Sequence, residues 1–259
     1  MISSHALVLF FEWVSLTGAG LTALKLLRSG LYRRYRFFFL YLVSLVPYDV
    51  CLLVLDVKSG LYQKFWTVTA PLFWLLYILV VFELCGLILE KHKGLYTLGR
   101  WAMYLGIVVA VTLSLLSLLP HITAAMPQRT RIMGYVYATE RGVDFSLAIF
   151  ILLILLFLSR YPVPISRNVA VHSVVFSLFF LSNTLGLLLH SVFGLHLIQE
   201  VDMLFMGTSS ACVVAWLVLL NAKGEKVRVS TRHFGRGDEE RILLQLDSLN
   251  DTLLRASRK

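Results

Sequence analysis

The chain has 259 residues, of which 58% are hydrophobic and 15% are charged. Soluble domains carry about 25% charged residues and about 45–50% apolar ones, so this composition excludes an ordinary water-soluble globule. It also excludes intrinsic disorder, which requires low hydrophobicity. Because the apolar residues occur in long runs, the sequence predicts a membrane protein with several spans.

The net charge is +9, from 24 Lys and Arg against 15 Asp and Glu. The basic residues lie mainly between the apolar runs, which indicates membrane topology and contact with anionic lipid headgroups. We therefore expect the lipid bilayer as a partner and no nucleic acid. Cys51, Cys85 and Cys212 each lie inside an apolar run with no CxxC spacing, so neither a disulfide framework nor a thiolate metal site is expected.

The apolar runs predict an all-α fold, a polytopic bundle of seven transmembrane helices. The predicted spans are residues 6–27, 37–57, 65–89, 101–119, 144–159, 169–192 and 203–221. At 1.5 Å per residue, most of them reach the ~30 Å thickness of the hydrocarbon core. The fifth span is short, and we expect its helix to begin near Ile132 and to project beyond the bilayer.

Positive charge predicts the orientation of the bundle. Counting outside the first helix, 18 Lys and Arg lie on one side, in alternate loops and the C-terminal tail, and five lie on the other. Because cytoplasmic loops are enriched in Lys and Arg, we expect the N-terminus outside and the C-terminus inside, in a plasma membrane or a bacterial-type inner membrane.

Small residues recur every four positions in the first and last spans, where they favour close helix packing inside one bundle. They are Ser15, Ala19 and Ala23, and Gly207, Ala211 and Ala215. Pro47 and Pro71 fall inside the second and third spans, and each is expected to kink its helix because proline lacks a backbone N–H.

The composition changes after Asn221. Residues 1–221 form the predicted transmembrane domain, 222–237 a basic linker, and 238–259 a cytoplasmic segment that forms one amphipathic helix. Its apolar face carries Ile242, Leu246, Leu249 and Leu253. We expect this face to dock on the inner face of the membrane or bundle, or to serve self-association or a cytoplasmic protein partner.

Polar residues inside the apolar spans are the candidates for function. A charged side chain at the bilayer centre costs about 2.5–3.5 kcal/mol on insertion scales, so such residues usually face the bundle interior. The candidates for a ligand or proton pocket are Glu12, Asp49, Glu83, Glu140, Arg141, Asp144, His172, Asn183 and His190.

Helical spacing groups several of these candidates. His172, Asn183 and His190 fall within about 20° of one another around the sixth helix, and Glu140, Arg141 and Asp144 share one face of the fifth. Under the expected topology most of the acids lie in the outer half, which predicts a polar cavity there. The structural alternatives are solvation at the interface for groups near helix ends and ordinary internal hydrogen bonds for the deeper ones.

No catalytic, cofactor or metal motif is evident in the sequence. A retinal protein requires a lysine in the middle of the last span, which has none, and the zinc motif HExxH is absent. A dihaem arrangement on His172 and His190 would place its ligands about 27 Å apart along the helix. We therefore expect a protein that is not an enzyme and has no cofactor.

The sequence favours a seven-helix receptor or sensor-like module with a polar pocket in the outer half of the bundle. Two alternatives remain open. One is a proton- or ion-coupled transporter or channel, in which the intramembrane acids and histidines relay charge. The other is a non-catalytic subunit of a membrane complex.

Overall fold

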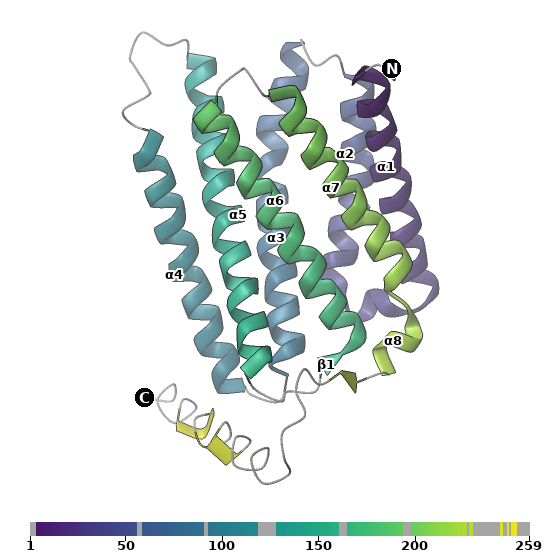
Figure 1. Ribbon diagram of the computed structural model, residues 1–259, viewed down its shortest axis with the longest axis vertical. Coiled ribbons are helices and arrows are strands. Elements are labelled where there is room, and N and C mark those ends of the chain that lie inside the picture. Colours follow the sequence, from purple (N-terminus) through teal and green to yellow (C-terminus); the bar gives the residue numbers. More distant parts are fainter. Residues whose placement is uncertain are drawn as a thin grey trace.

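The computed structural model describes residues 4–55, 59–90, 93–118, 128–160, 165–193, 198–226 and 228–229, and a few positions between 244 and 252. Within these ranges seven long helices run side by side as one bundle (Figure 1). They are α1 (Ser4–Arg28), α2 (Arg36–Val54), α3 (Gly60–Ile88), α4 (Lys93–Leu118), α5 (Gln128–Arg160), α6 (Arg167–Phe193) and α7 (Ile198–Leu219).

The helices have the length and apolar composition of membrane spans. Six of them are long and apolar enough to cross a bilayer, and α7 holds a shorter apolar segment, Met203–Leu219. Their length and composition indicate a helical membrane protein. The helix α5 begins at Gln128, well before its apolar run, as expected for a helix that projects beyond the bilayer.

Short elements gather at the end of the bundle opposite the start of α1 (Figure 1). The turn η1 (Leu31–Arg33) joins α1 to α2, α8 (Ala222–Lys226) follows α7, and β1 (Ile165–Ser166) pairs antiparallel with β2 (Arg228–Val229). Residues 222–226 and 228–229 are therefore regular structure, whereas the sequence predicts a linker across 222–237.

The helices differ in how deeply they are enclosed. Of the six candidate spans, α6 has the largest buried share, 56%, and α4 the smallest, 11%. The helix α6 packs against α5, α7 and α3, whereas α4 packs mainly against α5 at the edge of the bundle. Sites enclosed by protein are therefore expected around α6 and α7, and lipid-facing surface around α4.

Aromatic rings fill the bundle between α2, α6 and α7. Phe38, Phe176 and Trp216 are fully buried, and their ring centroids lie 4.6–5.7 Å apart in edge-to-face and tilted geometries. Such pairs add stability beyond that of the apolar area they bury. This cluster holds α2, α6 and α7 together.

Small residues let helices approach closely on α1, as their spacing predicts, whereas Ala211 of the repeat in the last span is exposed. Ala19 and Ala23 are buried in the bundle, and Gly18 of α1 lies against Val213 of α7. Among the described glycines, the one nearest to the backbone of another helix is Gly142 of α5, where an added methyl group would lie 2.7 Å from the Cα atom of Val111 on α4. Real Cβ atoms do not come so near, so a side chain here would push the two helices apart.

We predict that Gly142→Ala lowers the stability of the bundle by about 1–3 kcal/mol, because the added methyl group overpacks the α4–α5 contact. Gly106→Ala is the matched control, since Gly106 is on α4 and has nothing within 4 Å of its Cβ position. Thermal unfolding of the purified protein in detergent measures both. Equal midpoints for the two variants would contradict the close approach.

Candidate functional site

A polar cavity of about 260 Å³ lies where α1, α2 and α7 meet the first turn of α3. It is in the half of the bundle where α1 begins (Figure 1). Its described lining consists of Phe11, Glu12, Ser15, Asp49, Leu52, Leu53, Tyr62, Met206, Ser209 and Ser210. Two of the predicted pocket residues, Glu12 and Asp49, therefore meet in one cavity, which we call the outer pocket.

Local structure directs these side chains inward. Glu12 and Ser15 are three residues apart and so share one face of α1, and Asp49 is two residues beyond Pro47 of α2. The Ser210 hydroxyl donates a hydrogen bond to the Phe11 carbonyl, with an O···O distance of 3.1 Å, which ties α7 to α1 beside the pocket.

The outer pocket is strongly acidic. The Asp49 carboxyl group faces the Ser15 hydroxyl and interacts with the Glu12 carboxyl group, while its buried Oδ2 atom has no hydrogen-bond partner. Among the described lining residues none is basic. Two carboxyl groups that face one cavity repel each other when both are ionised, so this pocket favours a bound cation or proton.

Asp144 and Glu140 lie on α5, outside the lining of the outer pocket. Asp144 is sixteen residues from each end of α5, so it lies at mid-depth in the bundle. The predicted span 144–159 would instead place it at the membrane edge. Asp144 is 1% exposed, and neither carboxyl oxygen has a hydrogen-bond partner. Asn183 of α6 is the polar side chain that faces it.

Arg141 belongs to the contact between α4 and α5, although it shares a helical face with Glu140 and Asp144. Its Nε atom donates to the Ser114 hydroxyl of α4 at 3.0 Å, and its guanidinium also reaches the Ser114 carbonyl. Spacing along α5 predicts a shared face, whereas Arg141 reaches α4 and Asp144 faces Asn183 of α6. Arg141 acts as a link between two helices and not as a lining residue of the outer pocket.

Glu83 also lies away from the outer pocket. Its two carboxyl oxygens accept hydrogen bonds from the backbone N–H groups of Phe37 and Phe38, at 3.1 and 3.2 Å. These donors belong to the first turn of α2, where the helix leaves its N–H groups unpaired and favours negative charge. Glu83 of α3 therefore caps α2, which is a structural role.

His172 is part of the aromatic cluster. It is fully buried, neither ring nitrogen has a hydrogen-bond partner, and its ring centroid lies 4.2 Å from that of Phe38. Tyr35, Phe176 and Trp216 surround the same ring. His172 lines neither cavity described here, and the side chain of His190 lies outside the described residues.

A polar network lies at the opposite end of the bundle, and the sequence does not predict it. Glu225 of α8 forms a salt bridge with Arg34 at 2.7 Å and accepts a hydrogen bond from the Tyr35 hydroxyl at 2.8 Å. Asn168 donates to Glu225 and to the Asn221 carbonyl. We call these five residues the inner network. Separations of up to 191 positions, between Arg34 and Glu225, leave no local pattern in the sequence from which to find them.

Burial and electrostatics both tighten the inner network. Burial first, and then the Glu225 carboxylate, raise the pKa of the Tyr35 hydroxyl above its ordinary value, so this phenol stays protonated as a donor. On α1, Lys25 donates to the Leu217 carbonyl of α7, where the last turn of a helix lacks partners for its carbonyl groups. The end of α7 is thus held to α1, α2 and α6.

The C-terminal segment touches the bundle at the same end. The Asn250 side-chain oxygen accepts a hydrogen bond from the backbone N–H of Gly94, in the first turn of α4, at 2.7 Å. The four residues of the predicted apolar face, Ile242, Leu246, Leu249 and Leu253, lie outside the described residues.

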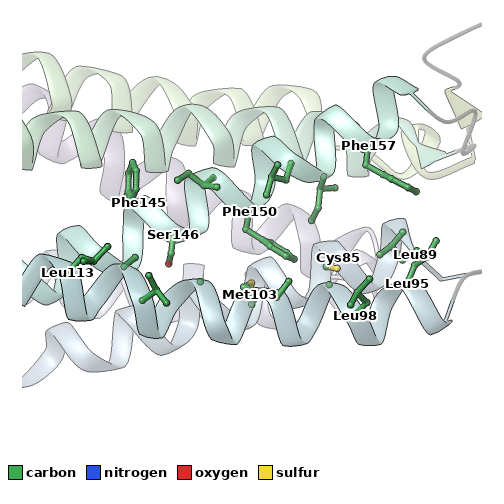
Figure 2. A pocket seen from close by; sticks show the side chains of 18 residues that line it. Cys85, Leu89, Leu95, Leu98, Met103, Leu113, Phe145, Ser146, Phe150 and Phe157 are labelled. Atoms are coloured by element: carbon green, nitrogen blue, oxygen red, sulfur yellow. The ribbon is translucent and has the colours of Figure 1, made fainter. Parts of the chain in front are cut away.

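A larger cavity of about 470 Å³ lies between α3, α4 and α5 (Figure 2). It is lined almost entirely by apolar side chains, several of which, such as Leu113 and Leu153, are more than half exposed. The hydroxyl of Ser146, which the lining includes, donates to the Val143 carbonyl of its own helix. This groove faces the lipid side of α4 and contains none of the candidate acids.

Comparisons of the chain with family models, with curated proteins and with solved structures find no match. The function is therefore argued from the two ends of the bundle, the outer pocket and the inner network.

We predict that Glu225→Gln lowers the free energy of unfolding by about 1–3 kcal/mol, because it removes the charge from a half-buried salt bridge whose carboxylate also accepts hydrogen bonds from Tyr35 and Asn168. Glu90→Gln is the matched control. Glu90 contacts the same Arg34 at 3.6 Å, but its side chain is 65% exposed, and exposed pairs contribute little. Denaturant or thermal unfolding separates the two variants, and equal losses would contradict the inner network.

Proposed function

We propose that the protein is a seven-helix membrane receptor or sensor whose outer pocket binds a small cation and whose cytoplasmic end passes on the response. The observation that carries this proposal is the meeting of Glu12 and Asp49, from two helices, in a cavity with no basic residue among its described lining. We assign the chain no enzymatic activity and no cofactor.

The charge and size of the outer pocket limit the class of ligand. A cation between the two carboxylates would remove their repulsion, and its attraction to them is stronger than in water because the site is partly buried. Typical pockets for drug-sized ligands are about 300–1,000 Å³. The volume of 260 Å³ therefore favours an inorganic cation or a small protonated amine.

The orientation follows from the basic residues. We propose that the end with the outer pocket faces outward and that the inner network faces the cytoplasm, where the basic loops and tail lie. The membrane would then be the plasma membrane or a bacterial-type inner membrane, and the C-terminal segment, which touches the bundle at Gly94, would face the cytoplasm, where a partner protein could meet it.

One helix connects the two ends. The helix α7 carries Ser210 at the outer pocket and Trp216 in the aromatic cluster, and it leads directly into Asn221 of the inner network. A cation that draws α1 and α2 together beside α7 would change the equilibrium between arrangements of this helix. Such a ligand has the differential affinity that any conformational response requires.

The runner-up is a proton- or ion-coupled transporter. It is favoured by Asp144, a carboxyl group at mid-depth in the bundle with no ion pair among the described residues. Ionisable residues at such depth often mark ion or proton pathways. Flux measured in proteoliposomes separates a transporter from a receptor.

We predict that small cations stabilise the wild-type protein against heat in a saturable way and that Asp49→Asn and Glu12→Gln each weaken this binding at least tenfold. The probes are sodium, ammonium and methylammonium ions, compared at constant ionic strength. Glu90→Gln, which lies away from the pocket, is expected to bind as the wild type does. Absence of saturable binding for every probe, or unchanged affinity in both pocket variants, would refute the proposal.

The orientation has its own test. We predict that a membrane-impermeant maleimide added to intact cells labels Ser4→Cys and leaves Ser257→Cys unlabelled until the cells are opened. Cys51, Cys85 and Cys212 lie in apolar helices, so the parent protein measures background labelling. Labelling of Ser257→Cys in intact cells would reverse the orientation.

A further inference from the structure

Asp144 is a buried acid that the outer pocket does not use. It lies at the midpoint of α5, is 1% exposed, and has two carboxyl oxygens without hydrogen-bond partners. It lines neither the outer pocket nor the apolar groove of Figure 2. A group this polar, in a bundle whose other deep polar side chains mostly have partners, requires an explanation.

The groups around Asp144 carry no positive charge toward it. Its own helix presents Glu140 one turn away, α6 presents Asn183, and the phenol groups of Tyr77 on α3 and Tyr41 on α2 complete the polar surroundings. The helix α4 approaches with the backbone of Ala110 and Val111.

Arg141, three residues before Asp144 on the same helix, directs its guanidinium to Ser114 on α4. Among the described residues no basic side chain forms an ion pair with Asp144.

An ionised carboxylate in these surroundings is strongly disfavoured. Taking one charge out of water costs several kcal/mol even after the protein relaxes, and only a nearby cation or several donors offset it. Asp144 has neither, and it lines neither described cavity where a metal ion would fit. Binding one proton removes the charge, so these contacts favour the protonated form of Asp144.

We propose that Asp144 is an intramembrane proton-binding site, loaded through Glu140 from the side of the outer pocket. In the packed bundle Asp144 holds the proton on its carboxyl group. Separation of α5 from α6 that admits water would ionise it, and the proton would leave through Glu140 to water. A proton would thus be released with any such opening, which makes the equilibrium between packed and open states depend on pH.

The site is placed to communicate with the outer pocket. Tyr48 of α2 interacts electrostatically with Glu140, and the next residue, Asp49, lines the pocket. The ring of Tyr48 packs on Phe73 of α3, with centroids 4.5 Å apart. A shift of α2 on binding a cation would therefore move Tyr48 relative to Glu140, the proposed route of the proton.

Infrared spectroscopy of the full-length protein tests the proposal. At pH 7 the wild type is expected to show the C=O stretching band of a protonated carboxyl group, which shifts when H₂O is replaced by D₂O. In Asp144→Asn the part of this band that belongs to Asp144 is lost, whereas Glu90→Gln keeps the whole band. An unchanged band in folded Asp144→Asn would overturn the proposal.

Stability of the variant provides the second reading. Because asparagine resembles a neutral carboxylic acid in shape and charge, Asp144→Asn is expected to elute as the wild type does and to unfold at a similar temperature at pH 7. Collapse of this variant would show that the negative charge is needed and would also overturn the proposal. Neither result decides whether Glu12 and Asp49 of the wild type bind a cation, so the two proposals fail separately.

Discussion

The structure depends on one constraint: a polar group inside the hydrocarbon core must find its partner within the bundle. The chain meets it with side chains that reach from one helix to another. Glu83 of α3 binds the first N–H groups of α2, Arg141 of α5 binds Ser114 of α4, and Lys25 of α1 binds a carbonyl of α7. These three intramembrane charges therefore hold helices together.

Against that background, the groups left without partners are informative. Asp49 keeps one carboxyl oxygen unpaired beside a cavity, and Asp144 keeps both unpaired in the packed interior. An unsatisfied polar group costs stability, so a fold that satisfies Glu83 and Arg141 but not these two acids leaves them available for a ligand. The different surroundings separate their roles: a cavity admits a cation, whereas close packing admits only a proton.

The sequence predicts the helices well because the bilayer itself imposes their length. The apolar run 37–57 corresponds to α2, Arg36–Val54, within three residues at each end. The sequence predicts the site less completely, since helical spacing shows which residues share a face but not which neighbouring helix that face meets. Glu12 and Asp49 do meet in one pocket, whereas Glu83 accepts a hydrogen bond from the first turn of α2, 46 positions away. His172 is polar by type, yet it packs as one more aromatic ring.

Rigid helices explain how two distant polar sites can act together. Between the outer pocket and the inner network lies the aromatic cluster of Phe38, His172, Phe176 and Trp216, whose rings interlock α2, α6 and α7. Packed interiors of this kind shift between discrete arrangements and do not deform continuously. A change of charge at Asp49 would therefore tilt α2 and α7 about the cluster as units. The half-buried pair of Arg34, just before α2, and Glu225, in α8 just after α7, is where such a tilt would be felt most strongly.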